Sequence, residues 1–294
     1  MPTCNCQASL FQRLTQLVAH AGLLVSIATI IGCVSPEQRA ERIARRHGLE
    51  PVVLRGIRFQ HHAYMALRGP SDLLVLFIDG DGSPWVRGGR EIAVDPTPHV
   101  PLALELAAAT PISVLYLARP CYLETVIPPE CSPRLWTSER YSAAVVASMA
   151  AAAAAFVAEH HFARVLLVGY SGGGTLAALM AQQLPEVSGL VSIAGNLDPD
   201  TWTQLHGYLP LEGSLNPALE PALPEQLKQW YLVGALDMTV PAAATGRYFR
   251  RISPDRVWSF ARFDHLCCWA DEWPSLFRKI MAELNAGETP DLQR

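Results

Sequence analysis

Short apolar runs alternate with longer helix-forming segments along most of the chain. A continuous apolar run bounded by turn residues is typical of a strand that is buried on both faces of a sheet. Such runs occupy 73–78, 112–117, 164–168, 190–193, 229–233 and 257–261. Segments whose length and Ala- and Leu-rich composition predict helices lie at 36–47, 101–109, 138–160, 175–184, 242–249 and 273–284. Two more runs, at 52–59 and 63–67, predict a hairpin-like pair of strands.

This alternation predicts an α/β fold, in which a mainly parallel sheet is covered by helices on both faces. We assign residues 51–286 to this domain, with an N-terminal helix at 34–50 before it and a short tail at 287–294 after it. The proline-rich stretch at 202–224 is predicted to be irregular. Functional residues are expected just beyond the carboxyl ends of the parallel strands, where ligands bind in sheets of this kind.

Residues 1–33 form a separate segment, which we interpret as a signal peptide or membrane anchor. The run at 17–34 is apolar almost throughout and follows a basic residue, which resembles a secretory signal. Its letters IIGC, at 30–33, resemble a bacterial lipobox, so Cys33 is the predicted lipidation site. The alternatives are an uncleaved anchor, an ordinary signal and a buried helix of a soluble protein, since the run is close to the length that spans a bilayer.

Every interpretation except the soluble helix exports the rest of the chain. We therefore expect a membrane-anchored lipoprotein that faces the periplasm or the cell exterior. Val34, directly after the cysteine, is not an inner-membrane retention residue, which favours the outer membrane if the source is Gram-negative. The net charge of −4 and the lack of a basic block argue against a nucleic-acid partner.

Four cysteines follow Cys33, and an even number in an oxidising compartment indicates disulfide bonds. Cys121 and Cys131 flank a short loop that contains two prolines, which predicts a bridge between them. Cys267 and Cys268 are adjacent, and three outcomes remain open: a vicinal bridge, two reduced thiols, or pairing with the first two cysteines. Their spacing from histidine pairs is not that of a zinc site, so no metal is expected.

The letters VGYSGGG, at 168–174, lie between a predicted strand and a predicted helix. A strand, a tight glycine-rich turn and a helix are the setting that a nucleophile elbow requires. Such a turn directs the Ser171 hydroxyl and the Gly172 N–H into the same space. The alternative is a helix N-terminus that binds phosphate, but the stretch has neither the lysine nor the G-x-G-x-x-G pattern of nucleotide-binding loops.

A serine nucleophile needs a base to remove its proton and a group that orients the base. His265, in FDH near the end of the last predicted strand, is the candidate base because a histidine titrates near neutral pH. Asp237, in GALDMTVP at the end of the preceding strand, is the candidate acid because the adjacent Val-Pro begins a helix. Asp198, which follows the strand before that, is the rival.

The motifs GYSGGG, GALDMTVP and FDH, in this order, resemble those of the α/β-hydrolase superfamily over 52–284. The resemblance implies acyl transfer by a triad of Ser171, Asp237 and His265, with no cofactor. The letters IDGDGSPW, at 78–85, resemble its oxyanion loop. They imply that the N–H of Asp81 assists that of Gly172, with the Asp81 carboxylate pointing away from the oxyanion.

The substrate is expected to be a small carboxylic ester or a related acyl compound. Trp85, Arg119 and Tyr170 are predicted to face its pocket. A peptidase, thioesterase or lactonase with the same triad is the alternative, because a fold does not determine a substrate. A second alternative is an envelope lipoprotein that has lost catalysis and retains a binding role. The chain also resembles uncharacterised bacterial secreted or lipoprotein α/β-hydrolases, which implies no particular substrate.

Overall fold

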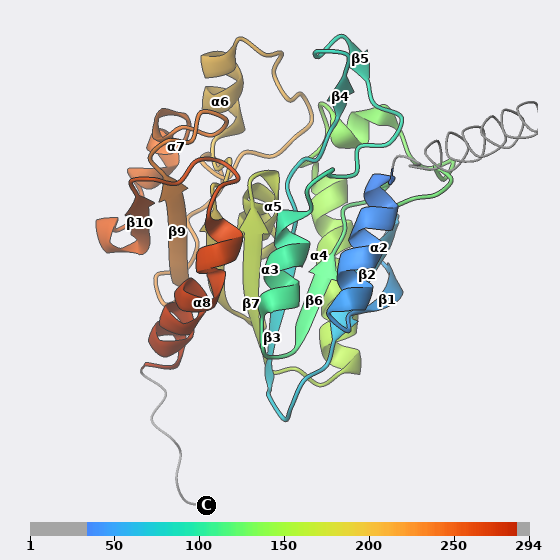
Figure 1. Ribbon diagram of the computed structural model, residues 1–294. Coiled ribbons are helices and arrows are strands. Elements are labelled where there is room, and N and C mark those ends of the chain that lie inside the picture. Colours follow the sequence, from blue (N-terminus) through green and yellow to red (C-terminus); the bar gives the residue numbers. More distant parts are fainter. Residues whose placement is uncertain (1–33, 287–294) are drawn as a thin grey trace, which may run out of the picture. The chain divides into compact units, whose positions relative to one another are not determined.

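Eight strands form one sheet in the computed structural model, which describes residues 34–286 (Figure 1). Their order across the sheet is β1-β2-β6-β3-β7-β8-β9-β10. Their bounds are β1 (Glu50–Arg55), β2 (Gln60–Ala66), β3 (Leu73–Ile78), β6 (Val114–Leu117), β7 (Arg164–Tyr170), β8 (Val187–Ile193), β9 (Lys228–Gly234) and β10 (Val257–Phe260). The predicted signal segment with Cys33 and the predicted tail at 287–294 lie outside the described residues.

Strand β2 runs against both of its neighbours, and the other neighbouring strands are parallel. A short connection joins β1 and β2 as a hairpin, whereas each parallel pair needs a crossover that returns the chain to the same end of the sheet. The carboxyl ends of β3, β7, β8, β9 and β10 therefore meet at one edge. The predicted α/β fold with a mainly parallel sheet is confirmed.

Helices cover both faces of this sheet, with α2, α3 and α8 in front and α4 and α5 behind (Figure 1). Their bounds are α2 (Pro36–Arg46), α3 (Leu102–Ala109), α4 (Ala143–Glu159), α5 (Gly172–Met180), α6 (Pro199–His206), α7 (Ala242–Phe249) and α8 (Trp269–Asn285). Helix α2 packs against α3 and β1, so it belongs to the same compact unit as the sheet. Within residues 34–286, no helix is long and apolar enough to cross a membrane.

Helix α6 begins before the stretch at 202–224 that the sequence predicts to be irregular, and it extends into the start of that stretch. Its ends carry standard capping residues: the side chain of Asp198 accepts a hydrogen bond from the N–H of Thr201, and Pro199 opens the first turn. Gly207 closes the helix with a φ of 67°, the left-handed conformation that glycine adopts readily. The capping signals were therefore present, and the low apolar content of the helix obscured them.

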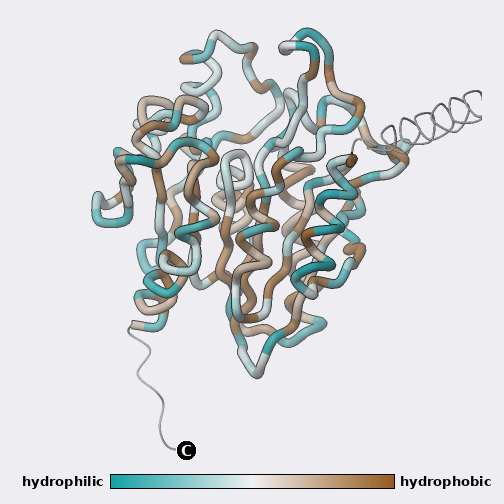
Figure 2. Tube along the Cα trace, in the orientation of Figure 1, coloured by the Kyte–Doolittle hydropathy of each residue, from teal (hydrophilic) through white to brown (hydrophobic). Residues whose placement is uncertain are grey.

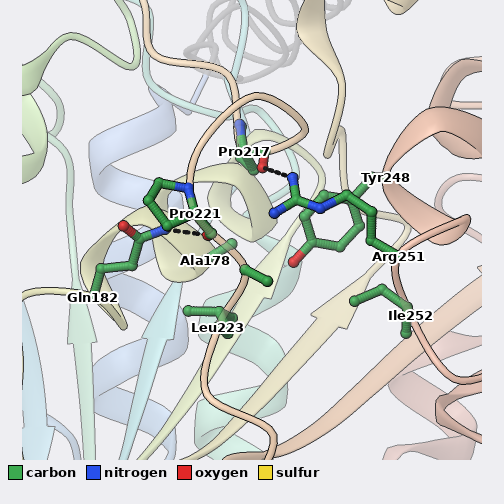
Figure 3. A pocket seen from close by; sticks show the side chains of 9 residues that line it. Ala178, Gln182, Pro217, Pro221, Leu223, Tyr248, Arg251 and Ile252 are labelled. Atoms are coloured by element: carbon green, nitrogen blue, oxygen red, sulfur yellow. Dashed lines mark hydrogen bonds between the residues drawn. The ribbon is translucent and has the colours of Figure 1, made fainter.

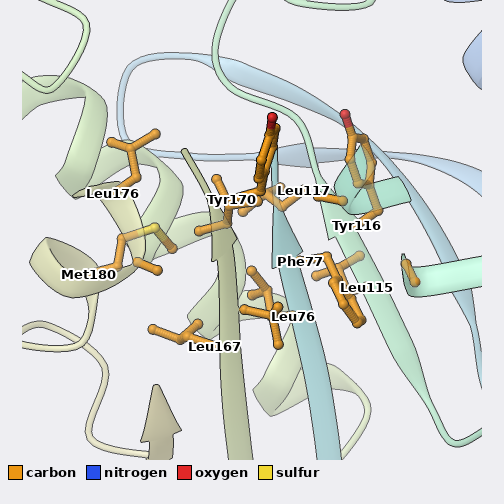
Figure 4. Close-up of a cluster of buried hydrophobic side chains, with 14 of the residues drawn as sticks. Leu76, Phe77, Leu115, Tyr116, Leu117, Leu167, Tyr170, Leu176 and Met180 are labelled. Carbon is orange, nitrogen blue, oxygen red and sulfur yellow. The ribbon is translucent and has the colours of Figure 1, made fainter. Parts of the chain in front are cut away.

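The core consists of apolar side chains on both faces of the central strands. All six residues of β3 are buried, and the hydropathy of the chain is highest along these inner strands (Figure 2). Figure 4 shows Leu76, Leu115 and Leu167 from three neighbouring strands beside Leu176 and Met180 of α5. This packing holds the end of β7 and the start of α5 in a rigid setting. A separate two-stranded hairpin, β4 (Trp85–Val86) and β5 (Glu91–Ile92), lies beyond the carboxyl edge of the sheet (Figure 1).

Candidate active site

Ser171 occupies the turn between β7 and α5 with a φ of 53° and a ψ of −121°. A positive φ is strained for any residue with a Cβ, and such strain persists only where the surroundings enforce it. Close approach of the backbone explains the glycines around it. A Cβ on Gly169 would lie 2.2 Å from the carbonyl oxygen of Gly173, and a Cβ on Gly173 would lie 2.2 Å from that of Ile78. The turn therefore has the geometry of the predicted elbow.

The structure brings together the three residues that the sequence predicts as a triad. The Nε2 atom of His265 lies 3.0 Å from the Oγ atom of Ser171, and its Nδ1 atom lies 2.8 Å from Oδ2 of Asp237. The side chain of Asp237 is 1% exposed and that of His265 is 19% exposed, so the pair is sheltered but accessible. With Nδ1 donating to the carboxylate, Nε2 is left to accept the proton of the serine.

Main-chain hydrogen bonds hold the acid in place. Oδ1 of Asp237 accepts from the N–H groups of Thr239 and Val240, each at 2.8 Å. The loop that carries His265 is braced in the same way, because Oδ1 of Asp264 accepts from the N–H of Leu266 at 2.8 Å. Hydrogen bonds within their own loops therefore hold Asp237 and His265 in contact.

Tyr170, predicted to face the substrate, instead supports the histidine loop. Its ring is buried, and its hydroxyl donates to the carbonyl oxygen of His265 at 3.0 Å. Burial raises the pKa of Tyr170 far above its usual range, so the hydroxyl keeps the proton that it donates. The hydroxyl of Tyr170 is therefore directed at the histidine loop, and its predicted contact with the substrate stays a prediction.

Asp198, the rival acid, has other partners. Its carboxylate accepts from Nε of Arg247 at 2.7 Å and from Nδ2 of Asn216 at 2.9 Å, and it caps α6. Burial alone would raise the pKa of Asp198, but the hydrogen bond from Arg247 holds it below its usual value. Asp198 therefore ties α6 to α7, and Asp237 is the aspartate that contacts His265.

The loop after β3 packs directly against the serine. A Cβ on Gly80 would lie 3.1 Å from the Cβ of Ser171, which explains the glycine there. In the part of the chain that the structure describes, no acceptor is paired with the N–H of Gly172 or with that of Asp81. Neither N–H group is therefore engaged by another main-chain acceptor, and their assignment as oxyanion donors stays a prediction.

The carboxylate of Asp81 lies close to the main chain of Gly172, and its predicted direction away from the oxyanion stays a prediction. A Cβ on Gly172 would lie 2.1 Å from Oδ1 of Asp81. Oδ1 also lies 2.5 Å from Nη1 of Arg119, and Oδ2 lies 2.8 Å from Nη1 of Arg140. Burial would raise the pKa of Asp81, but the two guanidinium groups outweigh it and hold the pKa well below its usual range. The two arginines therefore neutralise the negative charge of the Asp81 carboxylate.

Arg119, predicted to face the pocket, is 2% exposed. Its Nη2 atom donates to the carbonyl oxygen of Arg140 at 2.7 Å, so its guanidinium is committed to internal partners. Trp85 is 43% exposed on β4, which lies beyond the carboxyl edge of the sheet (Figure 1). The prediction for Arg119 was therefore wrong, and that for Trp85 stays a prediction.

Sequence reasoning missed three charged or polar residues near the serine. Arg140 and Tyr141 contact Asp81, and no spacing in the sequence connects them to it. Asp79 is 4% exposed at the end of β3. Burial raises the pKa of Asp79 to about 7, against the lowering effect of a hydrogen bond from the N–H of Gly80. The sequence signal for Asp79 was a carboxyl group that directly follows an apolar strand.

A second serine–histidine pair exists, but it is not accessible. Nε2 of His61 lies 2.9 Å from Oγ of Ser148, and both side chains are fully buried. Burial lowers the pKa of His61 to about 4, and its Nδ1 atom bonds the carbonyl oxygen of Ala118. This pair joins the β1–β2 hairpin to α4. Among residues 34–286, no group of three or more histidine, cysteine or acidic side chains is arranged to hold a metal ion.

Both remaining pairs of cysteines are bridged. Cys121 and Cys131 form a disulfide bond whose Cα atoms lie 5.8 Å apart, within the range of ordinary bridges. Cys267 and Cys268 form a vicinal bridge two residues after His265. Of the three outcomes that the sequence left open for the second pair, the structure shows the vicinal one.

A cavity beneath the 217–223 loop is separate from the triad. It is lined by residues that include Ala178 of α5, Tyr248 of α7 and Pro217 of that loop, and Arg251 donates to the carbonyl oxygen of Pro217 beside it (Figure 3). Its volume is about 10 Å³, which is the space of a single water molecule. It is too small for a substrate.

Comparisons with known proteins agree with this geometry. A family model described as "alpha/beta hydrolase fold" matches residues 128–210, which include Ser171. No curated protein matches the chain. A solved serine hydrolase without a lid, from Xanthomonas campestris, has a TM-score of 0.50 and 14% identity and covers 82% of this chain and 97% of its own.

Two further solved structures are similar over most of both chains. A putative lipase from Acinetobacter baumannii has a TM-score of 0.54 and 15% identity, covering 87% of this chain and 99% of its own. A membrane phospholipase A described as a bacterial virulence factor has a TM-score of 0.52 and 15% identity, and it covers 92% of this chain and 99% of its own. From its sheet topology, the turn at Ser171 and these matches, we conclude that this chain has the α/β-hydrolase fold.

Proposed function

We propose that this protein is a serine hydrolase that cleaves a carboxylic ester, or a related acyl compound, through a covalent acyl-enzyme. The observation that carries the proposal is the continuous hydrogen-bonded chain from Ser171 through His265 to Asp237. The fold supports a hydrolase. Among similar structures, one is described as a putative lipase and one as a membrane phospholipase A, which favours an ester over an amide.

In the proposed reaction, His265 removes the proton of the Ser171 hydroxyl while the oxygen attacks the acyl carbonyl. Asp237 holds the imidazole in the tautomer with Nδ1 protonated and stabilises the positive charge that forms on the ring. The same histidine then protonates the leaving alcohol. In the second half, it activates a water molecule that releases the acyl group and restores the serine.

The N–H groups of Gly172 and Asp81 are the proposed donors to the oxyanion of the tetrahedral intermediate. Donors that are already oriented need no reorganisation during the reaction, and each is typically worth about 3–4 kcal/mol of barrier. Gly80 and the positive φ of Ser171 allow the two main-chain segments to come close enough to share one oxyanion.

We also propose that the protein is exported and held at a membrane by its N-terminal segment, through lipid on Cys33. The support is the apolar run at 17–34 with its lipobox-like end. The two disulfide bonds suit an oxidising compartment.

Replacing Ser171 by Ala tests the proposed reaction. We expect loss of nitrophenyl-ester hydrolysis by several orders of magnitude and loss of labelling by a fluorophosphonate probe, with an unchanged circular dichroism spectrum. Ser275→Ala, at an exposed position of α8, is the matched control and should retain both signals.

Substantial hydrolysis by the folded Ser171→Ala variant would contradict the proposal. A wild-type protein that neither hydrolyses esters nor reacts with the probe would instead support the alternative of a binding protein. A panel of esters of graded chain length, thioesters, lactones and peptides then identifies the substrate class.

A further inference from the structure

A buried cluster of charged side chains lies directly behind the oxyanion loop. We call Asp81, Arg119, Arg140 and Tyr141 the Asp81 cluster. Besides the two ion pairs described above, the hydroxyl of Tyr141 donates to the carboxylate, 2.9 Å from Oδ1 and 2.7 Å from Oδ2. The members come from the end of β3, the end of β6 and the segment before α4, so only the folded chain assembles them.

The Asp81 cluster carries a net positive charge. It contains two guanidinium groups and one carboxylate, while burial holds the pKa of Tyr141 well above its usual range and keeps that residue neutral. The other hydrogen bonds of the arginines go to main-chain carbonyl groups: Nη2 of Arg119 donates to Arg140, and Nε of Arg140 donates to Thr137. Arg119 and Arg140 are 2% and 5% exposed, so solvent screens this charge weakly.

The net charge is more than a structural role requires. One arginine would neutralise the partly buried carboxylate of Asp81, and burying a second guanidinium without a second carboxylate is unfavourable for folding. In the described part of the chain, the Nε atom of Arg119 is also buried without a hydrogen-bond partner. The protein thus keeps an energetically unfavourable charge at this one position.

That position is next to both proposed oxyanion donors. A Cβ on Gly172 would lie 2.1 Å from Oδ1 of Asp81 and 2.6 Å from the hydroxyl of Tyr141. The second donor is the main-chain N–H of Asp81 itself, whose carbonyl oxygen accepts from the hydroxyl of Tyr122 at 2.9 Å. Charge in a buried site of low dielectric acts strongly on charge that develops nearby.

We propose that Arg119 and Arg140 are positioning residues for the oxyanion: they hold the Asp81 loop against Gly172 and place a net positive charge behind the two N–H donors. This inference rests on the proposed function. It assigns part of the stabilisation of the tetrahedral intermediate to side chains that do not touch the substrate. The charge acts on the anionic intermediate and not on the neutral ester, so it should affect kcat far more than KM.

Arg140→Gln and Arg140→Lys test the proposal, because glutamine removes the charge and lysine keeps it. We expect Arg140→Gln to lower kcat by about 10- to 100-fold with KM within about twofold. It should weaken a trifluoromethyl ketone, which adds to the serine as an anionic adduct, by the same factor. The matching methyl ketone, bound without that charge, should keep its affinity. Arg140→Lys should restore most of kcat.

Arg134→Gln is the matched control, since it removes one positive charge from the same segment but at a side chain that is 65% exposed and paired with Glu139. It should leave both inhibitor affinities unchanged. The proposal is overturned if Arg140→Gln weakens the two ketones equally, or if folded Arg140→Lys is as slow as Arg140→Gln.

Arg119→Gln decides the matter if Arg140→Gln does not fold. It removes the other positive charge of the cluster, so kcat should fall and the trifluoromethyl ketone should weaken relative to the methyl ketone by about 10- to 100-fold. Equal weakening of the two ketones in the folded variant would contradict the proposal. Fluorophosphonate labelling of the wild-type protein is independent of these variants, so failure of the proposed function is recognised separately.

Discussion

At the scale of single residues, two buried aspartates beyond strand ends have opposite roles. Asp237 presents one oxygen to His265 and the other to the main chain of its own loop. Asp198, one strand earlier, is enclosed by Arg247 and Asn216. The two residues have the same type and comparable positions in the sheet. The partners that surround each carboxylate, and not its sequence context, distinguish the proposed catalytic aspartate from the one that ties α6 to α7.

Asp237→Asn should lower kcat for ester hydrolysis by about 10⁴-fold, because an amide favours the wrong tautomer of His265. Asp198→Asn should leave kcat nearly unchanged but lower the free energy of unfolding by about 1–3 kcal/mol, since it weakens charged hydrogen bonds. Steady-state kinetics and urea unfolding on both variants measure the two effects. The opposite pattern would assign the acid to Asp198.

Asp79 makes stability depend on pH. Its pKa is raised from 3.8 to about 7 in the folded protein, so the native state holds a proton that the unfolded chain has already lost. Stability relative to Asp79→Asn should therefore be greatest below about pH 4 and fall as pH rises to about 7. Urea unfolding of both proteins between pH 4 and 8 measures this difference. His61 is present in both proteins, so its contribution to the pH dependence cancels in the difference.

Asp72→Asn provides the control for this experiment because its side chain is largely exposed. Its unfolding free energy should follow that of the wild-type protein across the same pH range. If Asp79→Asn and the wild-type protein show parallel curves between pH 4 and 7, the carboxyl of Asp79 does not carry a raised pKa.

At the scale of elements, the site depends on how closely α5 approaches the strands beside it. Gly173 brings the first turn of α5 against the carbonyl groups of Ile78 and Asp79, at the end of β3. That contact aligns the elbow with the oxyanion loop, because the two donors come from these two elements. The spacing of helix and strand is thus part of the proposed catalytic geometry.

Gly173→Ala should lower the free energy of unfolding by about 1–3 kcal/mol or more, since a methyl group would overlap two carbonyl groups. It should also reduce kcat, because β3 and α5 must separate. Gly246→Ala, within α7 where a Cβ meets nothing within 4 Å, should instead stabilise the protein by up to about 1 kcal/mol. Thermal unfolding and ester hydrolysis of the two variants and the wild-type protein measure these effects. A Gly173→Ala variant as stable and active as the wild-type protein would argue against this close packing.

At the scale of the whole molecule, all residues proposed for catalysis lie at the carboxyl edge of one sheet. Helix α2 precedes β1, which runs parallel to the central strands, so α2 begins at this same edge (Figure 1).

Cys33→Ser should release the protein from the membrane fraction and change its apparent mass, because a lipoprotein needs its several acyl chains for firm attachment. Expression of both forms in a bacterial host, followed by fractionation and mass spectrometry of the N-terminal peptide, measures this. Cys131→Ser serves as the control, since it also removes one cysteine but leaves the N-terminal segment intact. Unchanged membrane association of Cys33→Ser would indicate an ordinary anchor.

Local patterns in the sequence were sufficient for the strands of the main sheet, for most helices and for the choice of the candidate triad. Apolar runs and glycine turns are short-range signals, and the glycines around Ser171 indicated an elbow because few other residues permit that backbone. The order of Ser171, Asp237 and His265, each beyond a predicted strand, then placed them at one edge of the sheet. The bridge between Cys121 and Cys131 also followed from its short loop.

Only the tertiary structure decided where side chains point and which charges meet. Asp81 and Arg140 are 59 positions apart, and no periodic pattern links residues at such a distance. Contacts between elements that are far apart in the sequence also decide the directions of Arg119 and Tyr170, the hydrogen-bond partners of Asp198 and the burial of Asp79. Secondary structure arises from neighbouring residues, whereas burial and ion pairing arise from contacts between distant ones, and these contacts exist only in the fold.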